Sequence, residues 1–138
     1  DADVGARGLT GRFDIGAGVI RTVPDYFIPH AGAANFPWKS HALWYYSQMV
    51  RWGEVGASPA NAAVAAACFR PDLYRAALDA VGAPAPAVDY KTDGRRATPG
   101  EVAAQQGMLT MGPDLFFDGQ IYDPDALDAY IASQNSGA

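Results

Sequence analysis

One aromatic segment, FPWKSHALWYYSQMVRWG at residues 36–53, constrains the fold of this chain more than any other stretch. It holds all three tryptophans of the chain, and four apolar residues within it recur at helical spacing: Leu43, Tyr46, Met49 and Val50. Ser40 is suited to cap the N-terminus of such a helix, and Gly53 is suited to follow its C-terminus. Apolar groups occupy much of the helix circumference. The segment therefore predicts a largely buried packing helix rather than an aromatic binding site.

The composition is that of a compact globular protein and does not favour nucleic-acid binding. The 138 residues are 49% hydrophobic and 18% charged, which allows one real hydrophobic core. Fifteen acidic residues oppose ten basic ones, and the net charge is −5. Arg95 and Arg96, with Lys91 nearby, are the only dense basic spot, so no direct nucleic-acid binding is expected. No apolar run approaches the roughly 20 residues of a membrane helix, so no membrane span is expected either.

Proline, glycine and cap residues divide the rest of the chain. We expect four parts: a Gly/Pro-rich opening segment over 1–35, a helical core over 36–82, a strap over 83–113, and a hairpin with a closing helix over 114–138. Further elements are predicted inside them: a strand at 19–23, helices starting at Ser58-Pro59 and Pro71-Asp72, a short helix after Thr98-Pro99, a hairpin at 116–122 around Asp118-Gly119, and a last helix capped by Asp123. The chain is thus predicted to be mostly helical, with one short β-hairpin.

No pattern of residues in the sequence carries catalytic or metal chemistry. His30 and His41 belong to no zinc-binding spacing, and His41 on a buried helix is interpreted as a hydrogen-bonded structural residue. A nucleophile pair of Cys68 and His41 is an alternative. However, cysteine in an alanine-rich helix usually acts as a small hydrophobe, and one cysteine excludes an internal disulfide. We therefore expect no enzyme, no cofactor and no metal site.

Two further patterns receive ordinary structural explanations. Five aspartates gather near the C-terminus: Asp114, Asp118, Asp123, Asp125 and Asp128. They do not follow the calcium-loop pattern, and a turn and a helix cap account for Asp118 and Asp123. The glycines of LTGRFDIGAG at 9–18 match neither GxGxxG nor GxxxxGK[ST], so they predict a turn-rich segment rather than a phosphate loop.

Three motifs, in this order along the chain, resemble segments of the solute-binding proteins of the nitrate/bicarbonate ABC-importer family, within the nitrate/sulfonate/taurine superfamily. LTGRFDIGAG is similar to the family's xGxFxxGxG segment, and FFDGQIYDPDALDAYI resembles its C-terminal FDGxx[FY]DP followed by a closing helix. The most specific motif is the aromatic segment, which matches at these positions: Phe36, Pro37, Ser40, His41, Trp44, Gln48, Arg51, Trp52 and Gly53. The resemblance covers nearly the whole chain.

The resemblance implies an α/β fold of the periplasmic binding-protein type II, with two lobes around a cleft. Family members are longer, so this chain corresponds to their C-terminal part, and most anion-contacting residues would lie outside it. The one ligand contact that the resemblance places here is Thr10, where nitrate binders carry lysine and bicarbonate binders an acidic residue. A threonine hydroxyl can donate one hydrogen bond to an oxyanion. The signature residues of the aromatic segment are expected to be structural.

The function implied is that of the substrate-binding component of an ABC importer. The ligand would be a small oxyanion (nitrate, nitrite or bicarbonate, with nitrate preferred), held without covalent chemistry in the cleft between lobes. An ABC permease would be the partner, and the location periplasmic or extracytoplasmic. One alternative is a cytoplasmic nitrate or nitrite sensor that binds an RNA-antiterminator protein. Others are a stand-alone interaction domain without anion binding and, more distantly, a thiamine-pyrimidine enzyme, whose active-site set the sequence does not show.

The resemblance also predicts self-association. A part of a two-lobe protein that is separated from its other lobe should expose apolar surface. Such surface favours contacts between copies of the chain.

Overall fold

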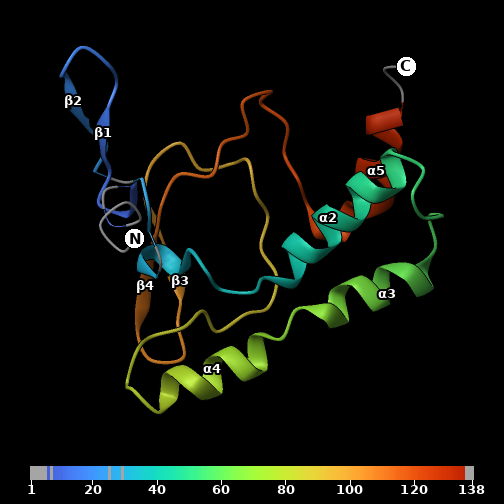
Figure 1. Ribbon diagram of the computed structural model, residues 1–138. Coiled ribbons are helices and arrows are strands. Elements are labelled where there is room, and N and C mark those ends of the chain that lie inside the picture. Colours follow the sequence, from blue (N-terminus) through green and yellow to red (C-terminus); the bar gives the residue numbers. More distant parts are fainter. Residues whose placement is uncertain (1–5, 7, 25, 29, 136–138) are drawn as a thin grey trace. The chain divides into compact units, whose positions relative to one another are not determined.

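The computed structural model describes residues 6, 8–24, 26–28 and 30–135. Its contacts divide the chain into two compact units, Asp1–Asn35 and Phe36–Ala138, which are described separately below. The described elements, in chain order, are β1 (Arg12–Asp14), β2 (Ile20–Thr22), η1 (Ala31–Ala33), α2 (Lys39–Arg51), α3 (Pro59–Cys68), α4 (Pro71–Asp79), β3 (Gly100–Ala103), β4 (Met108–Met111), η2 (Pro124–Ala126) and α5 (Leu127–Asn135) (Figure 1). The prediction of a mostly helical chain is confirmed. The described residues form two small antiparallel hairpins rather than the single one predicted.

The unit of residues 1–35 holds the first hairpin. Strands β1 and β2 pair antiparallel with Phe13 opposite Arg21, which confirms the strand predicted at 19–23. The turn between them is stabilised by Asp14, whose Oδ1 accepts a hydrogen bond of 2.9 Å from the Gly16 amide. The glycines of this segment thus serve a hairpin turn, as the sequence predicts. The four-part division of the whole chain stays a prediction.

The aromatic segment forms helix α2, but Ser40 does not cap it. The cap position is Trp38, which makes no side-chain cap bond, and Ser40 lies inside the first turn. The prediction was wrong because a distant backbone group supplies the cap: the Asp89 carbonyl accepts a 2.9 Å hydrogen bond from the Lys39 amide. The C-terminus is as predicted, since Gly53 has a φ of +73°. A 2.9 Å bond from the next amide to the Met49 carbonyl completes a Schellman motif.

Burial of α2 is one-sided rather than nearly complete. Its buried residues are Ser40, Ala42, Leu43, Tyr46, Ser47 and Gln48. Tyr45 and Trp52 instead remain 58% and 68% exposed. The helix packs against α3 and α5, which flank it in Figure 1. The sequence predicted a largely buried helix because apolar residues occupy much of its circumference. In the structure, one face of the helix is packed and another is open to solvent.

The other helices begin at the predicted caps. The Ser58 side chain accepts a 3.1 Å hydrogen bond from the Asn61 amide at the start of α3, and the Asp123 carboxylate accepts a bond of the same length from Asp125 at the start of η2. The Ser58 amide also donates to the Tyr46 hydroxyl at 2.9 Å, which ties the start of α3 to α2. Helix α4 begins at Pro71, as predicted, and ends at Asp79.

Two local predictions in the C-terminal half were wrong. The segment after Thr98-Pro99 is not helical but forms strand β3, which pairs with β4 in the register Val102 to Leu109. At 116–122, the predicted turn exists, because the Gly119 amide donates to the Phe116 carbonyl at 3.0 Å. No strand ladder flanks that turn in the described structure. The competing interaction is long-range: Tyr122 pairs with Asp93 instead, and their backbones exchange two 2.9 Å hydrogen bonds.

The Asp93 pairing depends on the glycine that follows it, and this generates a stability prediction. Gly94 has a φ of +90°, and a Cβ built there would lie 2.3 Å from the Gln120 carbonyl oxygen. Gly107 has a φ of +76° and nothing within 4 Å of such a Cβ. In urea unfolding, Gly107→Ala should lower the free energy of unfolding by about 1 kcal/mol, because alanine disfavours the left-handed backbone and meets no clash there. Gly94→Ala should cost roughly 3 kcal/mol, because a backbone clash is added. Equal losses for the two variants would contradict the packing described here.

Candidate functional site

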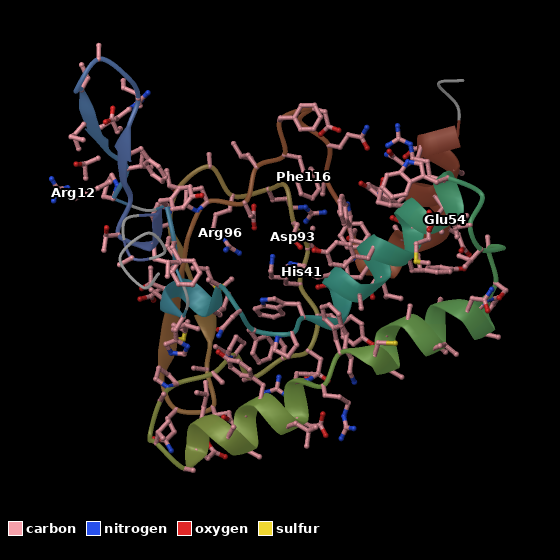
Figure 2. The ribbon with its side chains drawn as sticks, in the orientation of Figure 1. Arg12, His41, Glu54, Asp93, Arg96 and Phe116 are labelled. Carbon is pink, nitrogen blue, oxygen red and sulfur yellow. The ribbon has the colours of Figure 1, made fainter. Side chains whose placement is uncertain are left out.

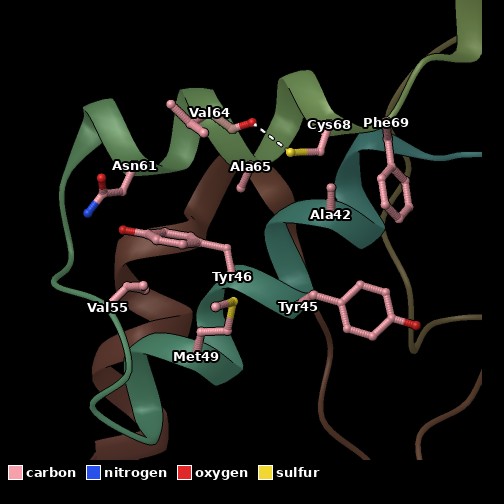
Figure 3. Close-up of a pocket in the computed structure, with 10 residues that line it drawn as sticks. All are labelled: Ala42, Tyr45, Tyr46, Met49, Val55, Asn61, Val64, Ala65, Cys68 and Phe69. Carbon is pink, nitrogen blue, oxygen red and sulfur yellow. Dashed lines mark hydrogen bonds between the residues drawn. The ribbon is translucent and has the colours of Figure 1, made fainter.

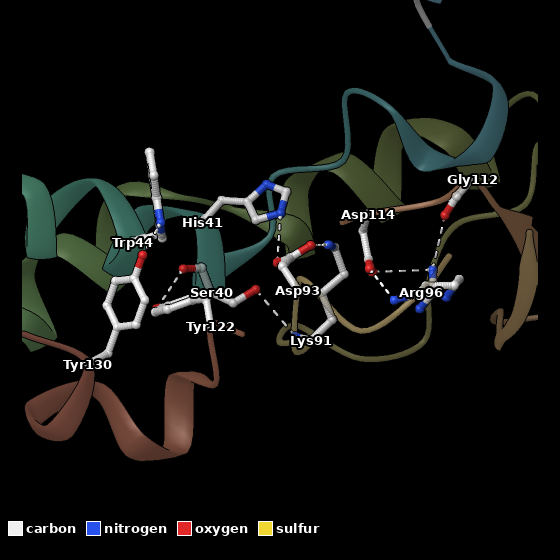
Figure 4. A network of polar contacts seen from close by, with 10 residues as sticks. All are labelled: Ser40, His41, Trp44, Lys91, Asp93, Arg96, Gly112, Asp114, Tyr122 and Tyr130. Atoms are coloured by element: carbon white, nitrogen blue, oxygen red, sulfur yellow. Dashed lines mark hydrogen bonds and ion pairs between the residues drawn. The ribbon is translucent and has the colours of Figure 1, made fainter. Parts of the chain in front are cut away.

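A network of polar contacts joins the start of α2 to two segments that lie far along the chain (Figure 4). The Ser40 side chain is fully buried, and its Oγ accepts a 3.2 Å hydrogen bond from the Lys91 amide. The Ser40 carbonyl accepts a 3.0 Å bond from the Tyr122 hydroxyl. Tyr122 in turn pairs with Asp93 through the backbone. We call Ser40, His41, Lys91, Asp93 and Tyr122 the Ser40 network.

Three titratable side chains meet inside this network. Lys91 Nζ donates to Asp93 Oδ1. His41 Nε2 lies 3.3 Å from Asp93 Oδ2, although this oxygen accepts no hydrogen bond within the described structure. Burial, and then the charge of Lys91, lower the pKa of His41 to about 4, so its imidazole is neutral at pH 7. The side chain of His41 is 41% exposed, and its interpretation as a structural histidine stays a prediction.

Lys91 is subject to opposing effects. Burial lowers the pKa of its ammonium group to about 8, while the Asp114 carboxylate acts in the opposite direction. The direct contact with Asp93 also favours the charged form. We therefore treat Lys91 as protonated at neutral pH, with its charge balanced by Asp93.

A second carboxylate, the part-buried Asp114, holds the neighbouring turn. Its Oδ1 accepts a 2.7 Å hydrogen bond from the Arg96 amide, and the Arg96 carbonyl accepts a 2.9 Å bond from the Asp114 amide. Its Oδ2 lies 3.7 Å from Arg96 Nη1 and accepts no hydrogen bond in the part of the chain that is described. No sequence motif indicates this role, because Asp93 pairs with Tyr122 and Asp114 with Arg96, which lie far from them in the chain.

The remaining signature residues of the aromatic segment tie α2 to its surroundings. Trp44 Nε1 donates to the Tyr130 hydroxyl at 3.0 Å, and Arg51 Nη1 donates to Gln134 Oε1 at 3.2 Å, both on α5. Gln48 is buried and donates to the Ser47 side chain at 3.1 Å. Trp52 is the C-terminal cap residue of α2. The structure thus shows contacts to other elements for several of these side chains.

Thr10, the one predicted ligand contact, lies in the other unit. It is exposed, and its amide donates to the Ala6 carbonyl at 3.0 Å. It is not brought together with the Ser40 network, since the two units are described separately. Its role stays a prediction.

Two of the hollows in the unit of residues 36–138 are lined by residues that the sequence singled out, Cys68 and His41. One is an open groove of about 370 Å³ between α2 and α3, whose lining is mostly apolar (Figure 3). Cys68 lines this apolar groove and is exposed, and its interpretation as a small hydrophobe stays a prediction. No residue of α3 is buried. The other hollow, of about 360 Å³, includes His41, so the structure places Cys68 and His41 in different hollows rather than as a nucleophile pair.

The aspartates near the C-terminus behave as turn and cap residues. Asp118 Oδ1 accepts a 3.0 Å hydrogen bond from the Gln120 amide, and Asp123 caps η2. The described residues contain no group of three or more His, Cys, Asp or Glu that could hold a metal ion. A search of the same residues finds no helix with the length and apolar character needed to span a membrane.

The Ser40 network generates a second stability prediction. Ser40→Ala should cost about 1–3 kcal/mol in urea unfolding, because it leaves the Lys91 amide without its acceptor. Ser133→Ala is the control, since the Ser133 Oγ donates to the Tyr130 carbonyl only three residues away on the exposed side of α5. The loss of unfolding free energy for this variant should be smaller. An equal or larger loss for Ser133→Ala would show that the long-range bond of Ser40 is not what stabilises this region.

Comparison with known proteins gives partial similarities and no complete match. No family model and no solved structure matches the chain. The nitrate/nitrite binding protein NrtA of Synechococcus elongatus is 33% identical over 100 residues, which are 71% of this chain and 18% of that protein. NrtA of Synechocystis sp. is 31% identical over 100 residues, covering 72% of this chain and 19% of the relative. The bicarbonate-binding protein CmpA of Synechococcus elongatus is 29% identical over 110 residues, covering 74% and 20%.

All three relatives are named as binding proteins, and this chain spans about a fifth of their length. The resemblance predicted from the three sequence motifs is confirmed. Over nearly three quarters of its length, this chain is homologous to part of the nitrate/nitrite- and bicarbonate-binding proteins NrtA and CmpA.

Proposed function

We propose that this chain is part of the substrate-binding component of an ABC importer for a small oxyanion, with nitrate or nitrite preferred. The similarity to two nitrate/nitrite binding proteins, at 33% and 31% identity, is the observation that carries the proposal. The bicarbonate-binding relative keeps bicarbonate among the substrates to be tested. The complete protein would have the two-lobe α/β fold and hold the anion without covalent chemistry between its lobes.

The charges of the 36–138 unit support a scaffold role for this part of the protein. Six of its lysines and arginines form ion pairs with carboxylates: Lys39, Arg70, Arg75, Lys91, Arg95 and Arg96. Lys39 and Arg75 share Asp89, at 3.1 and 2.7 Å. An oxyanion is best held by donors that are oriented toward it and not already engaged. We infer that the anion contacts lie mainly in the rest of the longer protein, with Thr10 as one contact from residues 1–35.

The proposal extends to location and partner. A binding protein that delivers an anion to an ABC permease works outside the cytoplasm, in the periplasm or on the outer surface. The complete gene should therefore encode an export signal and lie beside permease and ATPase genes. An adjacent antiterminator gene, together with the lack of an export signal, would instead favour the cytoplasmic sensor.

Calorimetric titration of the complete gene product tests the binding function. We expect nitrate and nitrite to bind with dissociation constants below 1 mM, on the order of magnitude of ordinary small-ligand sites. The 138-residue chain by itself should bind neither anion in that range, because most contacts lie outside it. Submillimolar binding by this chain alone would contradict the scaffold role. If neither the complete gene product nor the 138-residue chain bound nitrate, nitrite or bicarbonate, the alternative of a stand-alone interaction domain would be favoured instead.

Thr10 gives a residue-level prediction within the complete protein. Thr10→Ala should weaken nitrate binding about tenfold, because a hydrogen bond to a charged group contributes roughly 1.5 kcal/mol or more. Thr22→Ala is the control, since Thr22 is an exposed threonine on β2 of the same unit. The same titration measures both variants. Equal affinities for Thr10→Ala and Thr22→Ala would remove Thr10 from the site.

A further inference from the structure

The open groove of about 370 Å³ between α2 and α3 is lined by one regular stripe of residues from each helix (Figure 3). The lining residues of α2 stand at positions 42, 45, 46 and 49, and those of α3 stand at positions 61, 64, 65 and 68. Both sets follow the spacing i, i+3, i+4 and i+7, which places the members of each set on one face of their helix. The groove is therefore a valley between two helix faces, and we call it the α2–α3 groove.

The two walls of the α2–α3 groove are fixed to each other. The helices are consecutive and run in opposite directions, and Glu54 marks the connection between them in Figure 2. The Glu54 amide donates to the Met49 carbonyl at 2.9 Å, and the Ser58 amide donates to the Tyr46 hydroxyl at 2.9 Å. Val55, from the same connection, lines the groove at this end. The groove is thus a preformed feature of the 36–138 unit.

The lining offers few polar groups to an occupant. The Tyr46 hydroxyl already accepts a hydrogen bond of 2.9 Å. Asn61 Nδ2 donates to the Gly56 carbonyl at 2.9 Å, and Cys68 Sγ donates to the Val64 carbonyl at 3.4 Å. An occupant is therefore recognised by apolar contact, which suits neither a small oxyanion nor a charged peptide.

The apolar side chains of the α2–α3 groove remain open to solvent. Tyr45 is 58% exposed, Val64 is 67% exposed and Met49 is 39% exposed. Helix α3 has ten residues and no buried one. Most of the stability of so short a helix comes from packing its apolar face, and a contiguous exposed apolar surface marks an interaction site. The exposure of both walls indicates that a partner covers them.

A helix is the element that fits a valley of this kind. Two neighbouring helices with apolar stripes at i, i+3, i+4 and i+7 present the surface onto which a further helix packs in a helical bundle. A helix that lies in such a groove inserts its own apolar residues at the same spacing. The occupant indicated by the two stripes is therefore an amphipathic helix.

The source of this helix follows from the lengths of the relatives. The matched parts amount to 18–20% of the three relatives. The complete protein of the proposed function is therefore several times longer than the matched part, and its other segments can supply the helix. A helix in the same chain also has a high effective concentration at the groove, which favours it over a separate molecule.

We propose that an amphipathic helix from the rest of the complete protein packs into the α2–α3 groove, with its apolar side chains against Tyr45, Met49 and Val64. This inference rests on the proposed function, because it takes the chain as part of a longer binding protein. It deepens that function by identifying the face through which the 36–138 unit joins the rest of the protein.

The thiol of Cys68 reports whether the groove is covered, because it is exposed and lines the groove. Labelling with N-ethylmaleimide is followed at the Cys68 peptide by mass spectrometry, in the 138-residue chain and in the complete gene product. We expect labelling to be at least about tenfold slower in the complete protein, where the helix must first move away. In concentrated urea the two rates should be equal. Equal rates in the two folded proteins would overturn the proposal.

A charge placed in the groove tests the occupant. In the 138-residue chain, Val64→Arg should leave the midpoint of urea unfolding unchanged, because Val64 is exposed there. In the complete protein the arginine cannot be buried against an apolar helix, so labelling of Cys68 should rise to about the rate of the 138-residue chain. Ala63→Arg is the matched control, since Ala63 is the neighbouring exposed residue of α3 and does not line the groove. Labelling should stay slow in this variant, and identical rates for the two variants would contradict the proposed occupant.

Two further readouts separate this proposal from its alternatives. If labelling of the 138-residue chain slows as its concentration rises, the groove is covered by a second copy of the chain, and the proposed occupant is wrong. Calorimetric titration of the complete protein with nitrate decides the oxyanion function independently. Nitrate binding together with rapid labelling of Cys68 would remove only the groove proposal. Slow labelling without binding of any of the three anions would remove only the oxyanion function.

Discussion

The buried start of helix α2 is the point on which the rest of the 36–138 unit depends. Trp38 is almost fully buried, and its ring lies 4.7 Å from that of Phe36 in an edge-to-face contact. One turn of backbone then offers three groups to distant segments: the Lys39 amide to Asp89, the Ser40 side chain to Lys91, and the Ser40 carbonyl to Tyr122. Each of these is a buried or part-buried polar group that would be costly to leave unpaired. Residues 89–91 and the segment before α5 are thereby fixed to the same turn.

The elements that sequence reasoning predicted are those whose signals are local. A cap side chain bonds an amide two or three residues away, so Ser58 and Asp123 mark helix starts correctly. Gly53 marks the end of α2 for the same reason, because the left-handed backbone of a Schellman motif favours glycine. In each case the residues that decide the structure are neighbours in the sequence.

The elements that sequence reasoning missed are decided by partners far along the chain. Ser40 has the side chain of a cap, yet the Asp89 carbonyl bonds the amide at the helix start, which leaves the serine hydroxyl to Lys91. Strand β3 follows a helix-start signal, but pairing with β4 overrides it. The candidate site shows the same limit. In the sequence Asp93 looks like an ordinary turn residue, and its pairing with the distant Tyr122 is visible only in the structure.

The ion pairs of the 36–138 unit explain why it is proposed as a scaffold and not as the main oxyanion site. The ion pairs of residues 70–96 engage cations that an anion would need, as with Arg75 on Asp89 and Lys91 on Asp93. Asp93 and Asp114 each accept a hydrogen bond on one oxygen, and their second oxygens lie 3.3 Å from His41 Nε2 and 3.7 Å from Arg96 Nη1. Part-buried charges that are paired in this way hold distant segments together, because leaving either partner alone in a low-dielectric site would be costly. Cations engaged in such pairs are poor donors for a further anion, which is why the anion contacts are proposed to lie mainly in the rest of the longer protein.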